Sequence, residues 1–235
     1  IYTLSLHDAL PISSLAWPDG PLGGAALTLA LSLASGAASA LLGLALGIAL
    51  AMLRQRALRA ALLGALAFLR AIPVLMLIFW VYFLLPIAFG LDVPELLTVV
   101  LALSLVGGAY LAHSVYAGIS SLPPGQMQAA LALGMTRWQA MRRVVLPQAL
   151  PMMLPSFVNQ WIALIKDTSL AYVIGVGELS FVATQVNNRV MVYPAEIFLA
   201  VAVLYYLMCA SLDVASGWLL KRNEEIGRAS CRERV

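Results

Sequence analysis

The chain has 235 residues, of which 62% are hydrophobic and only 11% are charged, and its mean hydropathy is +0.93. A soluble domain carries about 25% charged residues. This chain therefore has too little charge to cover a water-facing surface, which excludes a soluble enzyme, a disulfide-rich secreted scaffold and a disordered chain. The apolar residues form long unbroken runs, which predicts an all-α, polytopic membrane protein and not a β-barrel. The net charge of +3 comes from basic residues between these runs, so it indicates membrane topology and not nucleic-acid binding.

Both ends differ in composition from the rest of the chain. Residues 1–13 and 224–235 resemble translated sequencing-adapter sequence more than protein, and we expect both to be non-native. Residues 14–223 are predicted to form a single transmembrane domain.

Five segments are apolar over a length that can cross a bilayer, for which about 20 residues are needed. The predicted spans are about 24–51, 64–88, 95–119, 152–174 and 195–219.

Basic residues gather on one side of these spans. The first and third connections and the residues after the last span contain eight of them: Arg54, Arg56, Arg59, Arg137, Arg142, Arg143, Lys221 and Arg222. The opposite connections contain Arg189 alone. Because basic residues favour the cytoplasmic side, we expect the N-terminus outside and the C-terminus and the loop 120–147 inside.

The first span carries small residues at four-residue spacing: Ser35, Ser39, Gly43, Gly47 and Ala51. Such a face lets helix backbones approach closely. It fits a contact within the subunit or a contact between subunits.

The loop 120–147 contains strong breaks in helical pattern. Pro123, Pro124 and Gly125 end the third span, and a short helix is predicted over about 126–133. Gly134 interrupts it, and a second helix is predicted to reach about Val145. Prolines at 147, 151 and 155 then predict a bent or interfacial entry to the fourth span.

A longer pattern runs through the same loop. Gln128-Ala129-Ala130 is followed by three residues, Gly134, nine residues, and Val144-Val145-Leu146-Pro147. This pattern resembles the signature loop of ABC-importer permeases. Further similarity to their polar amino-acid subfamily is carried by Leu69-Arg70-Ala71-Ile72-Pro73, Gly108-Ala109-Tyr110-Leu111-Ala112, Leu146-Pro147-Gln148-Ala149 and Lys166-Asp167-Thr168-Ser169-Leu170.

The resemblance implies a type I ABC importer-like permease core in a bacterial cytoplasmic (inner) membrane. The coupling helix would dock on a separate ATPase subunit through Gln128, Ala129, Ala130, Gly134 and Pro147. ATP and Mg²⁺ would bind to that subunit, since this chain has no GxxxxGK[ST] loop. A second permease subunit, identical or paralogous, and an extracytoplasmic substrate-binding protein are the other expected partners, and no catalytic or metal site is expected in this chain.

The chain also departs from the family pattern. Gln128 stands where the family has Glu, and His113 and Tyr116 stand where the third span usually has Glu and Arg. The element at Arg70 lacks the usual Gly and Thr. These departures concern the substrate more than the transporter assignment.

Ionisable residues inside membrane spans are costly and therefore candidates for function. Lys166 and Asp167, with the hydroxyls of Thr168 and Ser169, would line or gate a substrate path. Alternatively, they form an internal network that fixes the bend of the fourth span and the contact between permease subunits. Glu178 is a further candidate for a gate. Arg70 is interpreted as a residue at the membrane boundary, with contact to the substrate as the alternative.

Two other functions are considered. In an intramembrane aspartyl protease, Glu178 of the Gly175-Val176-Gly177-Glu178 turn would pair with Asp167. A membrane scaffold without transport activity is the second. Neither accounts for the spacing between Gly134 and Pro147.

Overall fold

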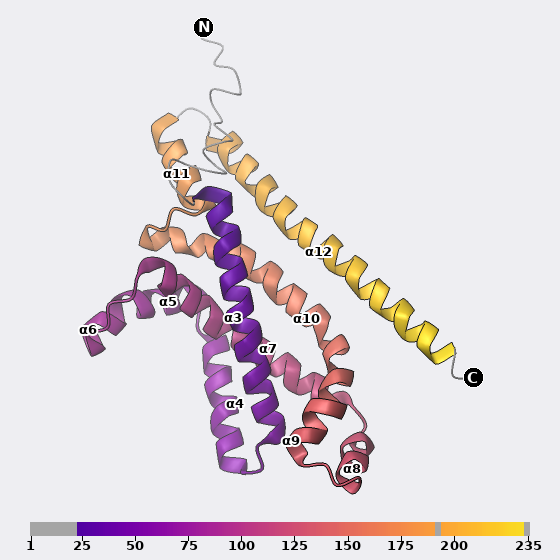
Figure 1. Ribbon diagram of the computed structural model, residues 1–235. Helices are drawn as coiled ribbons and strands as arrows, with labels where there is room; N and C mark the ends of the chain where they lie inside the picture. Colours follow the sequence, from indigo (N-terminus) through magenta and orange to yellow (C-terminus); the bar gives the residue numbers. More distant parts are fainter. Residues whose placement is uncertain (1–22, 191–193, 233–235) are drawn as a thin grey trace. The chain divides into compact units, whose positions relative to one another are not determined.

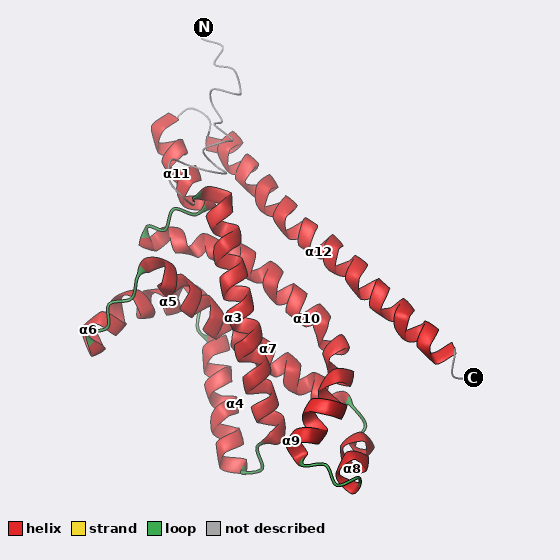
Figure 2. Cartoon of the chain, viewed as in Figure 1, coloured by secondary structure: helices red, strands yellow, loops and turns green. Residues whose placement is uncertain are grey.

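The computed structural model describes residues 23–190 and 194–232, with side chains described up to Gly217 except that of Val190. These residues form helices and connecting loops without a β-strand (Figure 2). One isolated parallel bridge joins Gly24 to Glu178. The all-α prediction is confirmed. The segment 1–13, expected to be non-native, lies outside the described residues.

The helices follow one another along the chain as Figure 1 labels them. They are α3 (Gly24–Met52), α4 (Arg56–Ala71), α5 (Val74–Phe79), η1 (Trp80–Leu84), α6 (Leu85–Phe89), α7 (Glu95–Ser121), α8 (Pro124–Ala132), α9 (Arg137–Ala140), η2 (Met141–Val145), α10 (Leu146–Asp167), η3 (Thr168–Ile174), α11 (Leu179–Val190) and α12 (Pro194–Arg232). The segments η1 and η2 are π-helical, and η3 is a 3₁₀ helix. Residues 224–232, also expected to be non-native, continue α12, and 233–235 lie outside the described residues.

Three of the described helices are long and apolar enough to cross a membrane, namely α3, α7 and the Pro194–Gly217 part of α12. A fourth is obtained if α4 and the α5–α6 segment are one bent span. The helix α10 is not among them; it contains two internal prolines and the polar side chains of Gln148, Asn159 and Gln160, so it is less apolar along its length. The count of five spans therefore stays a prediction.

The second span differs from the single helix expected over 64–88. The helix α4 ends at Ala71 and α5 begins at Val74, with Pro73 as its N-cap. Proline has no N–H to continue the helix, and it disfavours helical backbone at the preceding residue. Pro73 thus divides this segment.

The chain forms two compact units. Of the described residues, unit 1 contains 23–38, 72–105, 161–190 and 194–211, and unit 2 contains 39–71, 106–160 and 212–232. Each unit has its own apolar packing.

In unit 1, α11 packs against α12. Their buried side chains are Leu179, Val182, Ala183, Val186, Ile197 and Val201. Tyr205 and Met208 of α12 are half-buried against this cluster. The contact fixes α11 beside the first half of α12.

In unit 2, the small residues of α3 bring it against α7. A Cβ added at Gly43 would lie 2.4 Å from the Leu111 Cβ, and one at Gly47 would lie 2.5 Å from the Val115 Cβ. Only glycine fits at either position. The small face at these two residues therefore makes a contact within the subunit.

Candidate functional site

The helix α8, in the loop expected to couple, ends in a glycine turn. Gly134 has a φ of +83°. The Met135 N–H donates to the Ala130 carbonyl at 3.2 Å, and the Gly134 N–H donates to the Leu131 carbonyl at 3.0 Å. These two bonds around a left-handed glycine form a Schellman motif, which satisfies the last carbonyls of the helix. Gly134 can adopt this left-handed φ and so end α8 because it has no Cβ; a residue with a Cβ would be strained here.

The next helix begins immediately after this turn. The Thr136 hydroxyl accepts from the Gln139 N–H at 3.2 Å, and the Thr136 N–H donates to the Gln139 Oε1 at 2.9 Å. This capping box starts α9 at Arg137. Only Leu133, Gly134 and Met135 separate the end of α8 from this cap, so the turn is short and determined at both sides.

From α9 the chain is helical without a break as far as α10. The π-helical segment η2 leads directly into Leu146, whose N–H donates to the Met141 carbonyl five residues earlier. Pro147 lies directly after this segment and has no N–H to donate within the continuous helix. The second loop helix, expected to end at about Val145, therefore continues through the prolines instead of stopping.

The five predicted coupling residues lie along this segment. Gln128, Ala129, Gly134 and Pro147 are exposed, and Ala130 is buried. The exposed surface of α8 thus contains the polar side chain of Gln128 and the small side chain of Ala129. Ala130 is buried on the opposite side of the helix.

Two large apolar side chains flank the glycine turn and were missed in the sequence. Leu133 is 80% exposed and Trp138 is 52% exposed. Their apolar character predicts burial, and only the helix ends at Gly134 and Thr136 turn them outward. Leu133 and Trp138 thus add apolar surface on either side of the glycine turn.

The helix α8 is attached to the start of α10. The Gln148 Nε2 donates to the Gln126 Oε1 at 3.4 Å and to the Val144 carbonyl at 2.8 Å. Figure 1 shows α8 beside α9 at this end of unit 2, and α8 also packs against η2. The coupling segment is therefore tied to the helix that follows it.

The predicted path residues lie where α10 passes into η3. Lys166 is exposed, Asp167 and Ser169 are half-buried, and Thr168 is fully buried. The Thr168 hydroxyl donates to the Ile165 carbonyl at 2.7 Å. Thr168 thus bonds to the last turn of α10, while the side chains of Lys166, Asp167 and Ser169 reach the surface of unit 1.

Glu178 is buried in a hydrogen-bonded cluster of unit 1. Its Oε2 accepts from the Ser180 N–H at 2.9 Å and from the Tyr205 hydroxyl at 2.9 Å, and its Oε1 accepts from the Phe181 N–H at 2.9 Å. The Leu179 N–H donates to the Thr28 hydroxyl at 3.2 Å.

These bonds make Glu178 the cap of α11 and join it to α12. Burial raises the pKa of the Glu178 carboxyl above its ordinary value, and the bonds from Ser180, Tyr205 and Phe181 partly offset this rise. No contact in the described residues joins Glu178 to Lys166 or Asp167.

A polar cavity of about 290 Å³ lies within unit 2. Its lining comes from α4, α7 and α10 and consists of Arg70, Tyr110, Leu111, His113, Ser114, Ser156, Asn159 and Gln160. We call this the polar cavity. None of these residues belongs to the predicted path. Arg70 and His113 stand out among them in the sequence, but neither indicated a cavity there.

Two arginines of α4 lie over tyrosines of α7. The guanidinium of Arg70 is 5.3 Å from the ring centre of Tyr110, and that of Arg59 is 5.0 Å from the ring centre of Tyr116. Arg59 also donates a hydrogen bond to the Tyr116 hydroxyl. Only Arg70 lines the polar cavity. Its interpretation as a boundary residue stays a prediction.

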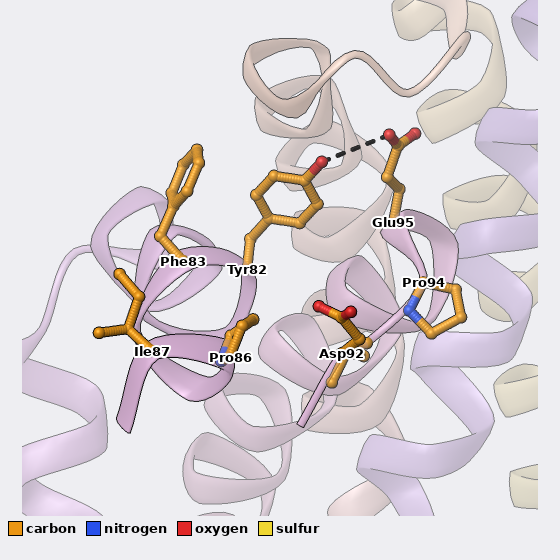
Figure 3. A pocket seen from close by; sticks show the side chains of 8 residues that line it. Tyr82, Phe83, Pro86, Ile87, Asp92, Pro94 and Glu95 are labelled. Atoms are coloured by element: carbon orange, nitrogen blue, oxygen red, sulfur yellow. Dashed lines mark hydrogen bonds between the residues drawn. The ribbon is translucent and has the colours of Figure 1, made fainter. Parts of the chain in front are cut away.

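A second, open pocket of about 610 Å³ lies in unit 1 around the α6–α7 connection (Figure 3). Tyr82 points toward α7, where its hydroxyl donates to the Glu95 Oε1 at 3.4 Å. Asp92 and Ile87 are exposed at its rim. Within the described part of the chain, no three His, Cys, Asp or Glu side chains gather as metal ligands would.

Comparison with known proteins identifies related chains. Residues 43–225 match the family described as binding-protein-dependent transport system inner membrane component. The chain is 38% identical over 160 residues to the glutamine transport system permease protein GlnP of Escherichia coli (strain K12), which covers 66% of this chain and 69% of that protein. It is 34% identical over 171 residues to the L-cystine transport system permease protein TcyB of Bacillus subtilis (strain 168), covering 73% of each.

Solved structures give the same result. The chain resembles an amino acid ABC transporter crystallised with histidines, with a TM-score of 0.75, 29% identity, and coverage of 85% of this chain and 92% of that one. The MetNI methionine ABC transporter has the same fold, with a TM-score of 0.73 and 23% identity over 83% of this chain and 92% of that one.

The protease alternative is wrong. The structural relatives are ABC transporters, and both Glu178 oxygens accept hydrogen bonds that cap α11 instead of facing a second carboxylate. The carboxyl pair that an aspartyl protease needs is not formed between Glu178 and Asp167 in the described residues.

Proposed function

We propose a function from one premise: this chain belongs to the family of binding-protein-dependent transport system inner membrane components, the non-enzymatic permease subunits of ABC importers. It is a multi-pass protein of the inner membrane, and ATP is hydrolysed by a separate subunit. The substrate, the docking residues and the topology are the parts that we propose.

The proposed substrate is a polar amino acid. Relatives that are 34–38% identical are permeases for glutamine, for glutamate and aspartate, and for cystine. The structural relative with 29% identity is an amino acid transporter. These agree in substrate class although they differ in the individual amino acid.

The proposed coupling element is α8 with its glycine turn, and this segment is the observation that carries the function. Its exposed surface joins Gln128 and Ala129 to the apolar side chains of Leu133 and Trp138. Such a surface fits a groove of the ATPase subunit. Because Gln128 is uncharged, it would hydrogen-bond in that groove without an ionic contact.

Movement of the ATPase would reach the permease through the short, capped connection. The Schellman motif, the capping box and the Gln126–Gln148 bond leave little slack between α8 and α10. A rigid helix that is held in this way transmits displacement as a body.

Two permease subunits, identical or paralogous, would form the path, with Lys166, Asp167 and Ser169 on its wall. Thr168 would fix the bend beside this wall, and Glu178 would hold α11 as part of a gate. An extracytoplasmic binding protein would deliver the amino acid. The N-terminus would lie outside and the C-terminus inside, in agreement with the basic residues of the first and third connections. ATP and Mg²⁺ would bind the partner ATPase alone.

The test is uptake by proteoliposomes that contain the complete transporter, with Gly134→Val compared with Gly125→Val. Neither added Cβ meets an atom within 4 Å, but only Gly134 has a positive φ, of +83°. A β-branched residue is a strong outlier at that φ. We expect Gly134→Val to insert normally while losing uptake per ATP hydrolysed, and Gly125→Val to stay coupled.

Coupled uptake by Gly134→Val at the wild-type ratio would contradict the docking assignment. Absence of any binding-protein-dependent amino acid uptake by the wild-type complex would contradict the substrate class.

A further inference from the structure

The turn between α3 and α4 carries two arginines that have no partner for their charge in the described part of the chain. The helix α3 ends at Met52 and α4 begins at Arg56, so only residues 53–55 connect them (Figure 1). Arg54 and Arg56 are exposed, and among the residues that the structure describes neither guanidinium has a hydrogen bond, an ion pair or a ring contact. Two permanent positive charges therefore lie at one short turn.

The third arginine of this region is different. Arg59 is half-buried, its guanidinium lies 5.0 Å from the ring centre of Tyr116, and it donates to the Tyr116 hydroxyl. It is thus used inside the subunit. The first turn of α4 contains no acidic residue, and the sequence has none from Gly20 to Leu91. No acid of this hairpin balances Arg54 and Arg56.

The helix α4 has one packed face and one uncovered face. Leu66 is buried in a cluster with Leu50 of α3, which forms the packed face. The uncovered face starts at Arg56, and the exposed apolar residues that follow it at helical spacing are Ala60, Leu63 and Ala67. We call the line from Arg56 to Ala67 the outer face of α4. Phe68, next to it in sequence, is 58% exposed.

A phospholipid fits the charges and the apolar face together. Its phosphate would accept hydrogen bonds from Arg54 and Arg56, because the planar guanidinium matches phosphate oxygens at two points. An acyl chain would then cover the outer face of α4. The helix rises roughly 17 Å from Arg56 to Ala67, close to the depth of about 15 Å of one hydrocarbon leaflet. A partner in water would match the two charges but would leave the apolar face uncovered.

The position of the turn agrees with a lipid headgroup. The helix α3 is long and apolar enough to cross a membrane, and Arg54 is the second residue after its end at Met52. Arginines directly after a span on the cytoplasmic side lie at the depth of the headgroups and attract anionic lipids. A zwitterionic headgroup would bring its own cation to a turn that offers no acid.

We propose that the α3–α4 turn binds the phosphate of an anionic phospholipid through Arg54 and Arg56, with an acyl chain on the outer face of α4. This rests on the proposed function, because that function places the turn on the cytoplasmic side of an inner membrane. The bound lipid would hold the start of α4 at the level of the headgroups.

The experiment titrates the detergent-purified permease–ATPase complex with phosphatidylglycerol or with phosphatidylcholine of identical chains. Native mass spectrometry gives the Kd of the first bound lipid. We expect phosphatidylglycerol to bind at least about tenfold tighter, since each arginine at an anionic surface contributes a factor of about five. Glycerophosphoglycerol, which is the headgroup without chains, should not displace it at equal concentration, because it cannot cover the outer face of α4.

The double variant Arg54→Gln/Arg56→Gln should weaken phosphatidylglycerol binding by about tenfold or more and leave phosphatidylcholine binding within about twofold. Arg54→Lys/Arg56→Lys should keep most of the preference, because the charges remain and only the planar fork is lost. The matched control is Arg59→Gln, which removes an arginine of the same helix that already has Tyr116 as its partner. We expect it to change the Kd of phosphatidylglycerol by less than about twofold.

The inference is overturned if the two lipids bind equally to the wild type, if the double glutamine variant keeps the preference, if Arg59→Gln loses as much of it as that variant, or if glycerophosphoglycerol displaces the lipid. The first comparison needs no variant, so it does not depend on the folding of one. Binding-protein-dependent uptake by the wild-type complex is measured in parallel. Amino acid uptake together with any of those four results would leave the proposed function intact and refute the lipid site alone.

Discussion

Gly47 is the position at which a single added methyl group gives the clearest prediction. In Gly47→Ala the new Cβ would lie 2.5 Å from the Val115 Cβ and 2.8 Å from the Ala112 carbonyl oxygen. Carbon atoms pack at about 3.5–4.0 Å. Both neighbours are fixed to the α7 backbone, so neither can rotate away, and α3 and α7 must separate by about 1 Å.

The expected effect follows from two opposing terms. Overpacking of this kind costs about 1–3 kcal/mol, and the absence of a flexible neighbour places Gly47→Ala near the upper end. Replacing Gly by Ala inside a helix stabilises by about 1 kcal/mol. The net loss is therefore about 2 kcal/mol. In Gly64→Ala the methyl group meets nothing within 4 Å, so only the gain of up to about 1 kcal/mol remains.

The assay is thermal unfolding of both variants in the same detergent. A difference of about 3 kcal/mol corresponds to roughly 6–12 °C in Tm for a chain of this size, with Gly47→Ala below the wild type and Gly64→Ala at or above it. A Gly47→Ala protein with a Tm equal to that of Gly64→Ala would refute the close contact between α3 and α7.

Two predictions concern the cluster around Glu178. Tyr205→Phe removes the hydroxyl that bonds Glu178 and Ser180, and we expect a loss of about 1–3 kcal/mol of stability in thermal unfolding. The control Tyr206→Phe changes a neighbouring side chain that is 70% exposed, and its stability should stay within about 0.5 kcal/mol of the wild type. Equal losses in the two variants would contradict the hydrogen bonds of Tyr205. The folded pKa of Glu178 is raised above 4.5, so its contribution to stability should be present at low pH and decline as the pH rises through the folded pKa. A plot of Tm against pH should therefore be flatter for Glu178→Gln than for the wild type. The control Glu196→Gln, at an exposed position, should not flatten it.

The parts of the fold that could be predicted are those that depend on local sequence. Apolar length alone indicates α3, α7 and α12, because a helix that crosses a bilayer must be apolar along its whole length. Gly134 was predictable as a break because the left-handed backbone that ends a helix favours glycine. In the second span, apolar length obscured the effect of Pro73, and one helix was expected where there are two.

The polar cavity could not be predicted, because it depends on which faces of three helices meet. Arg70, considered alone at the end of α4, is consistent with a boundary residue. Arg70 is seen to line the polar cavity only when α7 places Tyr110 and His113 near it and α10 adds Asn159. Spacing along one helix does not contain this information.

The helix α10 unites features that were considered separately in the sequence. Near its start, Gln148 is bonded to Gln126 of α8; farther along, Asn159 lines the polar cavity; and Lys166 lies in its last turn. A helix moves as one body when its hydrogen bonds are continuous. If the ATPase displaces α8, the displacement would reach the wall of the polar cavity through α10. The prolines at 151 and 155 lie between Gln148 and Asn159 and interrupt the hydrogen bonds of α10, so the helix can bend at this point and reduce the transmitted displacement.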